Sequence, residues 1–179
     1  MARRIEEPLY DVLETYEDFE LRRYGPTVQA RVQTAGRDGG AASGGFRRVA
    51  GYIFGGNSER TSIAMTAPVH MWEEDGSGWL AFTMPSAFAL ETLPSPNDAG
   101  VRLHPTSTST VAVARFSGRT TPKKTAGVEA GLRAAIEREG YAAVGPAVLA
   151  VYENPWTTLP FMRRNELHLH LESSDGAAP

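Results

Sequence analysis

Apolar residues recur at helical spacing over residues 46–54 and then at strand spacing over residues 63–71. The helical positions fall at i, i+3, i+4, i+7 and i+8 and form one apolar stripe, consisting of Phe46, Val49, Ala50, Ile53 and Phe54. Residues 55–57, Gly-Gly-Asn, accept positive φ and would end this helix. From 63 to 71 apolar residues occupy every second position, which predicts a strand with one apolar face.

The N-terminal part of the chain alternates in the same two-residue pattern. Residues 8–16 and 19–24 predict two strands of a hairpin joined at Glu17-Asp18, and the alternation resumes over 28–34 after Gly25-Pro26. Residues 35–45 are small and glycine-rich, which predicts a flexible loop reaching the helix N-terminus near Ser43.

The C-terminal part predicts a second helix between further strands. Strands are expected at 110–116, 147–152 and 165–171. Thr121 is the expected N-cap with Pro122 at the first helical position, and Gly140 is the expected end. The apolar face of this helix is the set Val128, Leu132, Ala135 and Ile136.

The two parts repeat one order of elements, strand-helix-strand-strand, without repeating their residues. A proline-rich stretch at 91–100 separates the halves, which span about 8–90 and 101–172. We therefore expect an α+β fold in which two βαββ halves form an antiparallel, partly closed and distorted barrel with two helices packed on it. Residues 1–172 would be a single domain, and residues 173–179 a disordered tail.

Composition narrows the classes of function. The 179 residues carry a net charge of −3, whereas a general nucleic-acid binder is usually basic, so no nucleic-acid partner is expected. No run of 18 apolar residues exists, so no membrane span is expected. The chain contains no cysteine, which excludes disulfides and thiolate chemistry and makes a reducing cytoplasm the default location.

Candidate chemistry is sparse. His168 and His170 alternate with leucines at a spacing that can bind a metal, but a solvent-facing row is favoured because no third ligand is placed. Carboxylates on strands, Glu166 among them, could act as general bases, although surface positions are favoured. No nucleophile-elbow, phosphate-binding or zinc-hydrolase motif is present, so no catalytic residue is named. An apolar slot flanked by arginines is the arrangement that a haem or another tetrapyrrole requires.

Five stretches of the sequence resemble the SOUL family of haem-binding proteins. They are ETYEDFELRRYGP (14–26), GFRRVAGYIFGGN (45–57), SIAMTAPVHM (62–71), ETLPSPND (91–98) and PFMRRNELHL (160–169). The resemblance covers most of the chain in the family's order, and it implies a partly closed barrel of two βαββ halves. That fold is also similar to the ligand-binding domains of small multidrug-sensing regulators.

The resemblance implies that haem or a porphyrin binds in an apolar groove between the first helix and the loop before the last strand. The expected binding residues are Phe46, Arg47, Val49, Ala50, Ile53, Phe54, Trp156, Phe161 and Met162. Arg47 or Arg48 would meet the propionates. The position at which one branch of the family is proposed to carry an axial histidine is Arg23 here, so haem would bind without that ligand.

The function expected from this resemblance is a carrier or buffer of haem or related tetrapyrroles that performs no catalysis. Two alternatives stay open. One is an enzyme that acts on haem or a hydrophobic small molecule, by iron removal or hydrolysis. The other is a ligand-sensing or protein-interaction module, for which protein partners are unknown.

Overall fold

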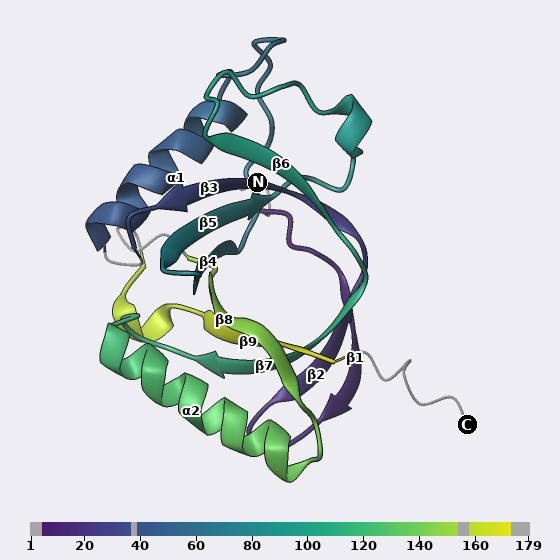
Figure 1. Ribbon diagram of the computed structural model, residues 1–179, viewed down its shortest axis with the longest axis vertical. Helices are drawn as coiled ribbons and strands as arrows, with labels where there is room; N and C mark the ends of the chain where they lie inside the picture. The colour runs from purple at the N-terminus through teal and green to yellow at the C-terminus, as the bar shows by residue number, and fades with distance from the viewer. Residues whose placement is uncertain (1–4, 37–38, 154–157, 173–179) are drawn as a thin grey trace. The chain divides into compact units, whose positions relative to one another are not determined.

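The computed structural model describes residues 5–36, 39–153 and 158–172, and these contain two α-helices, two 3₁₀ helices and nine strands (Figure 1). The elements follow the chain in this order: β1 (Tyr10–Thr15), β2 (Glu20–Tyr24), β3 (Thr27–Thr34), α1 (Gly39–Ile53), β4 (Val69–Glu74), β5 (Ser77–Thr83), η1 (Leu90–Thr92), β6 (Val101–Thr106), β7 (Ser109–Phe116), α2 (Pro122–Arg138), β8 (Ala143–Val151), η2 (Pro160–Met162) and β9 (Asn165–Leu171).

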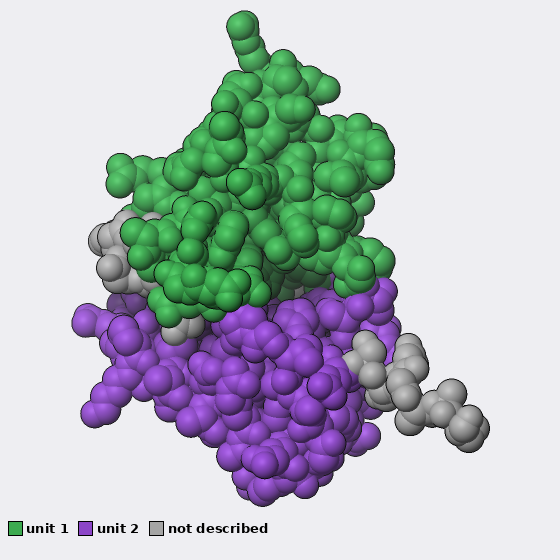
Figure 2. Space-filling view, viewed as in Figure 1, with its two compact units in different colours: residues 1–8, 26–107 green, residues 9–25, 108–179 purple. Residues whose placement is uncertain are grey.

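The predicted fold class is confirmed. Antiparallel strands that do not close into a complete barrel, together with two helices, form an α+β fold that is consistent with a distorted, partly closed barrel. The chain divides into two compact units, coloured separately in Figure 2: unit 1 comprises residues 1–8 and 26–107, and unit 2 comprises residues 9–25 and 108–179. The first hairpin, β1–β2, therefore belongs with the C-terminal strands of unit 2.

Unit 1 contains the strand order β4-β5-β3-β6, with α1 packed on β3, β5 and β6. Its core combines strand residues such as Val32, Leu80 and Phe82 with Val49 and Ile53 of α1. The predicted apolar stripe therefore does place the helix on the sheet, and burial of this face stabilises the unit.

Both ends of α1 are set by local chemistry. The helix begins at Gly39, four residues before the expected start near Ser43, so part of the glycine-rich stretch is helical. At the other end Asn57, fully buried, donates through Nδ2 to the carbonyl oxygens of Tyr52 and Thr61 at 3.0 and 2.8 Å. This side chain satisfies a helix carbonyl that would otherwise have no donor.

The strand predicted over residues 63–71 is wrong in its first part. Regular pairing with β5 begins only at Val69, and earlier residues make isolated bridges at Ser62 and Thr66. Pro68 lies between the two parts, and because proline has no N–H it cannot donate to a ladder. The alternation of apolar residues continues through the break, which is why the sequence pattern did not reveal it.

Unit 2 contains the strand order β1-β2-β7-β9-β8, with α2 packed on β7, β8 and β9. The expected start of α2 is confirmed: the Thr121 side chain accepts a hydrogen bond from the Lys124 amide, and Pro122 is the first helical residue. Gly140 follows the helix at φ +81°, a conformation that favours glycine. Leu132, Ala135 and Ile136 are buried, as the predicted face requires.

Candidate functional site

The apolar stripe of α1 divides into a buried side and an exposed side. Val49 and Ile53 are 0% and 1% exposed, and they belong to the core of unit 1. Phe46 and Phe54 are 38% and 65% exposed, and Ala50 between them is half-buried. These three residues, at i, i+4 and i+8, form a partly exposed line that we call the outer stripe. The Phe46 ring in this line also packs edge-on against the buried Phe82, with ring centres 5.2 Å apart. Five apolar residues of this helix were expected to bind a ligand. Only those of the outer stripe are exposed enough for a ligand to contact them.

The two arginines of α1 lie in different surroundings. Arg48 is held by Asp98, with Nε and Nη2 each donating to a different carboxylate oxygen at 2.7 Å. The hydrogen bond from Arg48 and a second from the Gly100 amide lower the pKa of Asp98 to about 2. Arg47 is exposed and follows Phe46 directly, so it flanks the outer stripe. Of the two propionate partners expected from the sequence, Arg47 is the one beside the exposed apolar side chains.

The other expected binding residues lie in unit 2, at and before η2. Phe161 and Met162 are 73% and 63% exposed, and Leu159 beside them is exposed as well. Trp156 lies outside the described residues. The segment before β9 thus carries a second set of apolar side chains in solvent, a feature that is typical of surfaces which bind something else.

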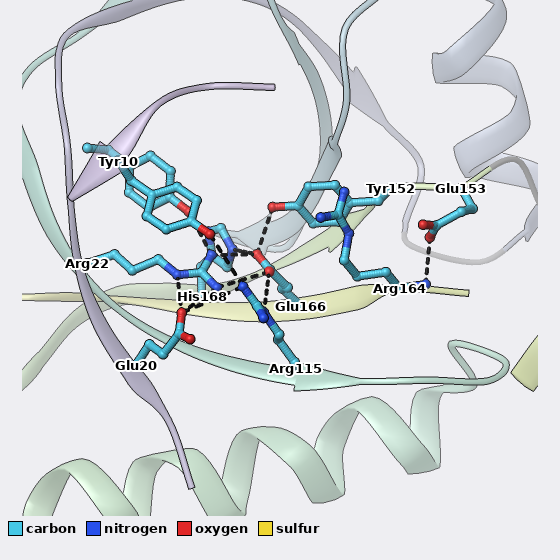
Figure 3. A network of polar contacts seen from close by, with 10 residues as sticks. Tyr10, Glu20, Arg22, Arg115, Tyr152, Glu153, Arg164, Glu166 and His168 are labelled. Atoms are coloured by element: carbon cyan, nitrogen blue, oxygen red, sulfur yellow. Dashed lines mark hydrogen bonds and ion pairs between the residues drawn. The ribbon is translucent and has the colours of Figure 1, made fainter. Parts of the chain in front are cut away.

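A buried polar network occupies unit 2 on the side of the strands away from α2 (Figure 3). Arg22 of β2 and Glu166 of β9 are 0% and 1% exposed. Arg22 donates through Nη1 and Nη2 to the two oxygens of Glu166 at 3.0 and 3.2 Å, the fork geometry that makes such pairs strong. Arg22 Nε also donates to Glu20 at 2.8 Å, so one guanidinium joins two carboxylates.

Three further donors complete the shell of the Glu166 carboxylate. They are Arg115 Nε at 3.2 Å, the Tyr152 hydroxyl at 2.7 Å and the Nε2 of His168 at 2.9 Å. Burial alone would raise the pKa of Glu166, but these hydrogen bonds and those from Arg22 hold it well below the usual value. A carboxylate with this many donors is a weak proton acceptor, and the network therefore does not present a general base.

Tyrosine rings cover the network. The Arg22 guanidinium lies 4.2 Å from the centre of the Tyr10 ring, and the centres of the Tyr10 and Tyr24 rings are 5.2 Å apart. Burial raises the pKa of Tyr24 to about 12, so its hydroxyl stays protonated and accepts a hydrogen bond from Arg22 Nη1. At the other end Arg164 lies 3.7 Å above the Tyr152 ring. Cation–π contacts of this kind hold the charged groups in a fixed arrangement.

The positions of Glu166 and His168 correct two expectations from the sequence. Both were expected on a solvent-facing strand surface, and that prediction is wrong because both side chains are buried. Strand β9 is buried on both faces, with leucines on one and the polar network on the other. The signal that could have found it is the alternation Glu20-Arg22-Tyr24 in β2, which offers a cation and a hydroxyl for a buried carboxylate on another strand.

Comparison with known proteins identifies the family. The family model described as "SOUL heme-binding protein" matches residues 5–170. The chain belongs to the SOUL haem-binding protein family. Heme-binding protein 2 of Homo sapiens is 31% identical over 115 residues, which cover 59% of this chain and 55% of that protein. The matched segment thus spans about half the length of that curated relative.

Solved structures of low sequence identity share the fold of this chain. The EcmrR C-terminal domain is 10% identical with a TM-score of 0.66, and the match covers 92% of this chain and 98% of that one. A hydrolase from Listeria innocua is 12% identical with a TM-score of 0.59 over 85% and 91% of the two chains. At these identities the likeness shows a shared fold alone.

The ligands expected of a SOUL-family haem site can be compared with the residues present. Arg23, at the position of the proposed axial histidine, is exposed on β2. Helix α1 contains no histidine, methionine or cysteine, and the hydroxyl of its one tyrosine, Tyr52, donates to the Pro94 carbonyl at 2.9 Å. Within the described residues no group of three or more His, Cys, Asp or Glu could hold a metal ion. The outer stripe and Arg47 fit the apolar ring and the propionates of a tetrapyrrole, whereas α1 offers no iron ligand.

Proposed function

We propose that this SOUL-family protein binds haem or a related tetrapyrrole on the outer stripe of α1 and acts as a carrier or buffer. The observation that carries the proposal is the exposure of Phe54 just after α1 and the partial exposure of Phe46, next to the buried Val49 and Ile53. A porphyrin is a flat apolar ring with carboxylates at one edge, so it complements an apolar line flanked by the Arg47 guanidinium.

Family membership supports the class of ligand, since the family model and the human relative are both named for haem binding. The chemistry of the site favours binding without an axial protein ligand. Apolar contact and propionate pairing do not depend on iron, so metal-free protoporphyrin should bind with an affinity similar to that of haemin. Phe161 and Met162 of η2 belong to unit 2, and a role for them in binding is tested separately.

A carrier or buffer role follows from the kind of site proposed. The outer stripe presents no nucleophile, base or metal ligand, so the bound ring would be held and released unchanged. Within the described residues no helix is long and apolar enough to cross a membrane.

The experiment is a haemin titration followed at the Soret band. Wild type should show a saturable shift, and Phe54→Glu should weaken binding about tenfold or more, because it places a charge against the ring and near the propionates. The matched control is Leu9→Glu, since Leu9 is also an exposed apolar residue, at 91% exposure. Phe161→Glu tests the η2 contact in the same assay. Equal affinity of wild type and Phe54→Glu would contradict the proposed stripe, and no saturable shift in wild type would contradict haem binding itself.

A further inference from the structure

Unit 1 contains a pocket that the tetrapyrrole proposal does not use. Its volume is about 290 Å³, and it is lined by Gln33, Arg48, Trp79, Gly100 and Arg102. Arg48 precedes Ala50 by two residues, which is about 200° around the helix axis, so the pocket does not lie on the outer stripe. Three of the five lining residues end in groups that recognise anions or planar rings, namely two guanidinium groups and one indole.

One wall of the pocket is built to hold the Arg48 guanidinium in place. Asp98 binds Arg48 through both carboxylate oxygens, and the Gly100 amide donates to Asp98 Oδ1 at 2.8 Å. A Cβ atom at Gly100 would lie 1.8 Å from Arg48 Nη2, so the guanidinium occupies the space that any other residue would fill. A larger residue would push the end of the Arg48 side chain aside, so the glycine leaves the room in which Arg48 lines the pocket.

A second lining residue, Arg102, brings another positive charge to the pocket. Arg102 of β6 lies directly opposite Arg31 of β3 in the strand ladder, and like charges in that position are destabilising. Arg31 Nε donates to the amide oxygen of Gln29 at 2.9 Å. In the described part of the chain no hydrogen bond or ion pair engages the Arg102 guanidinium. The nearby Asp98 is already engaged by Arg48, so an anion from outside would relieve this repulsion.

Trp79 supplies an indole to the pocket lining, and it stacks on the neighbouring Trp72. Trp79 of β5 lies opposite Gln33 in one ladder and opposite Trp72 in the other. The Trp72 and Trp79 rings are stacked at 6.1 Å with an interplanar angle of 12°, and the Arg31 guanidinium lies 5.2 Å from the Trp72 ring. Trp79 is half-buried, so part of its ring remains available to a planar group.

We propose that this pocket binds a small planar organic acid, with its carboxylate between Arg48 and Arg102 and its ring against Trp79. Guanidinium groups match a carboxylate in geometry as well as in charge. The volume is at the low end of the range for ligand pockets, about 300–1,000 Å³, and it suits one ring rather than a tetrapyrrole. The inference is independent of the tetrapyrrole site, because its residues lie elsewhere on unit 1.

The test uses benzoate as the probe, with binding to the full chain followed by calorimetry and by ligand-observed NMR. Wild type should bind benzoate saturably, and Arg102→Gln should weaken binding about tenfold or more, since it removes a charge-assisted hydrogen bond. Gly100→Ala should weaken binding as well, because the methyl group displaces Arg48. The matched controls Arg119→Gln and Gly127→Ala alter an exposed arginine and a glycine whose Cβ would meet nothing within 4 Å.

Three ligand comparisons decide the chemistry. Benzamide keeps the ring and lacks the charge, cyclohexanecarboxylate keeps the charge and lacks the flat ring, and inorganic phosphate is an anion with no ring. Each should bind more weakly than benzoate. Equal binding of benzamide, or undiminished binding by Arg102→Gln, would overturn the carboxylate site, and equal binding of phosphate or cyclohexanecarboxylate would overturn the role of Trp79. Phe54→Glu should bind benzoate as wild type does, which separates this result from the haemin titration.

Discussion

Each of the two helices packs an apolar face on the strands of its own unit, but the helices differ in how much of that face is buried. In α2 the large apolar residues Leu132 and Ile136 are buried, and Val128 is half-buried. In α1 the inner residues Val49 and Ile53 are buried in the same way, but Phe46 is partly exposed and Phe54, just after the helix, is mostly exposed. This difference in exposure is the observation on which the proposed tetrapyrrole site rests.

The sheet faces of the two units differ in a second way. In unit 2, Glu20 and Glu166 balance Arg22 and Arg115 within one hydrogen-bonded network. In unit 1, Arg31 and Arg102 oppose each other and Asp98 is engaged by Arg48. A balanced and buried network leaves no net charge for a ligand, whereas the Arg102 guanidinium beside a pocket favours an anion.

The largest effect is expected from breaking the balanced network of unit 2. Glu166→Leu should lower the free energy of unfolding by about 3–5 kcal/mol, because it removes one of the two carboxylates that bind the buried Arg22 and leaves other donors of the network without an acceptor. The double variant Arg22→Met/Glu166→Leu should recover much of this loss, since no buried charge of the pair remains. Urea unfolding measures both. If the loss of unfolding free energy in the double variant equals the sum of the losses in Arg22→Met and Glu166→Leu, the pairing of Arg22 with Glu166 does not contribute to stability.

The second effect contrasts adjacent residues of the α1 stripe. Ile53→Ala should cost about 2–4 kcal/mol, because it opens a cavity in the core of unit 1. Phe54→Ala should change the free energy of unfolding by no more than about 0.5 kcal/mol, since the side chain is already in water. Thermal and urea unfolding of the two variants measure the difference. A large loss for Phe54→Ala would show that the outer stripe is structural.

The third effect is the response of unit 2 to acid. The pKa of Glu166 is lowered in the folded state, so its contribution to stability is present above the unfolded value of 4.5 and is lost as pH falls below it. Wild type should therefore lose stability between about pH 5 and pH 2 more steeply than Arg22→Met/Glu166→Leu. Unfolding free energies measured across this range test the prediction, and parallel curves would contradict it.

The smallest effect is expected at the surface of α2. Glu129 and Arg133 form an i,i+4 ion pair at 2.8 Å, with both side chains partly exposed. Removing it by Glu129→Gln should cost only about 0.3–0.5 kcal/mol at low salt, and less at high salt. Unfolding measured at two salt concentrations provides the check, and a loss above about 1 kcal/mol would mean that this surface contributes as a core contact does.

Local signals predicted the helices well and the polar network poorly. Thr121, Pro122 and Gly140 mark α2 because capping and helix termination depend on neighbouring residues alone. The ion pair of Arg22 and Glu166 joins residues 144 positions apart, and alternation along β9 gives the same pattern for a polar face in water and a polar face in a buried network. Only the residues that another strand places against β9 decide whether its polar face lies in water or in a buried network.

The division of the α1 stripe could not be predicted for a similar reason. Helical spacing placed five apolar residues on one broad face, but that face is wider than the surface that β3 and β5 cover. Which edge of the face stays in solvent depends on how the helix lies on the sheet. The fold class and the family follow from local patterns and from the matched stretches, whereas the reachable part of the site follows from packing.

The most direct test of the central claim locates a diamagnetic tetrapyrrole on the protein. Zinc protoporphyrin would be titrated into ¹⁵N-labelled protein and the backbone amide shifts recorded for α1 and α2. The account predicts the largest saturable shifts around Phe46, Ala50 and Phe54, no comparable shifts along α2, and their loss in Phe54→Glu but not in Leu9→Glu. Saturable shifts that leave α1 unchanged, or equal shifts along both helices, would contradict it.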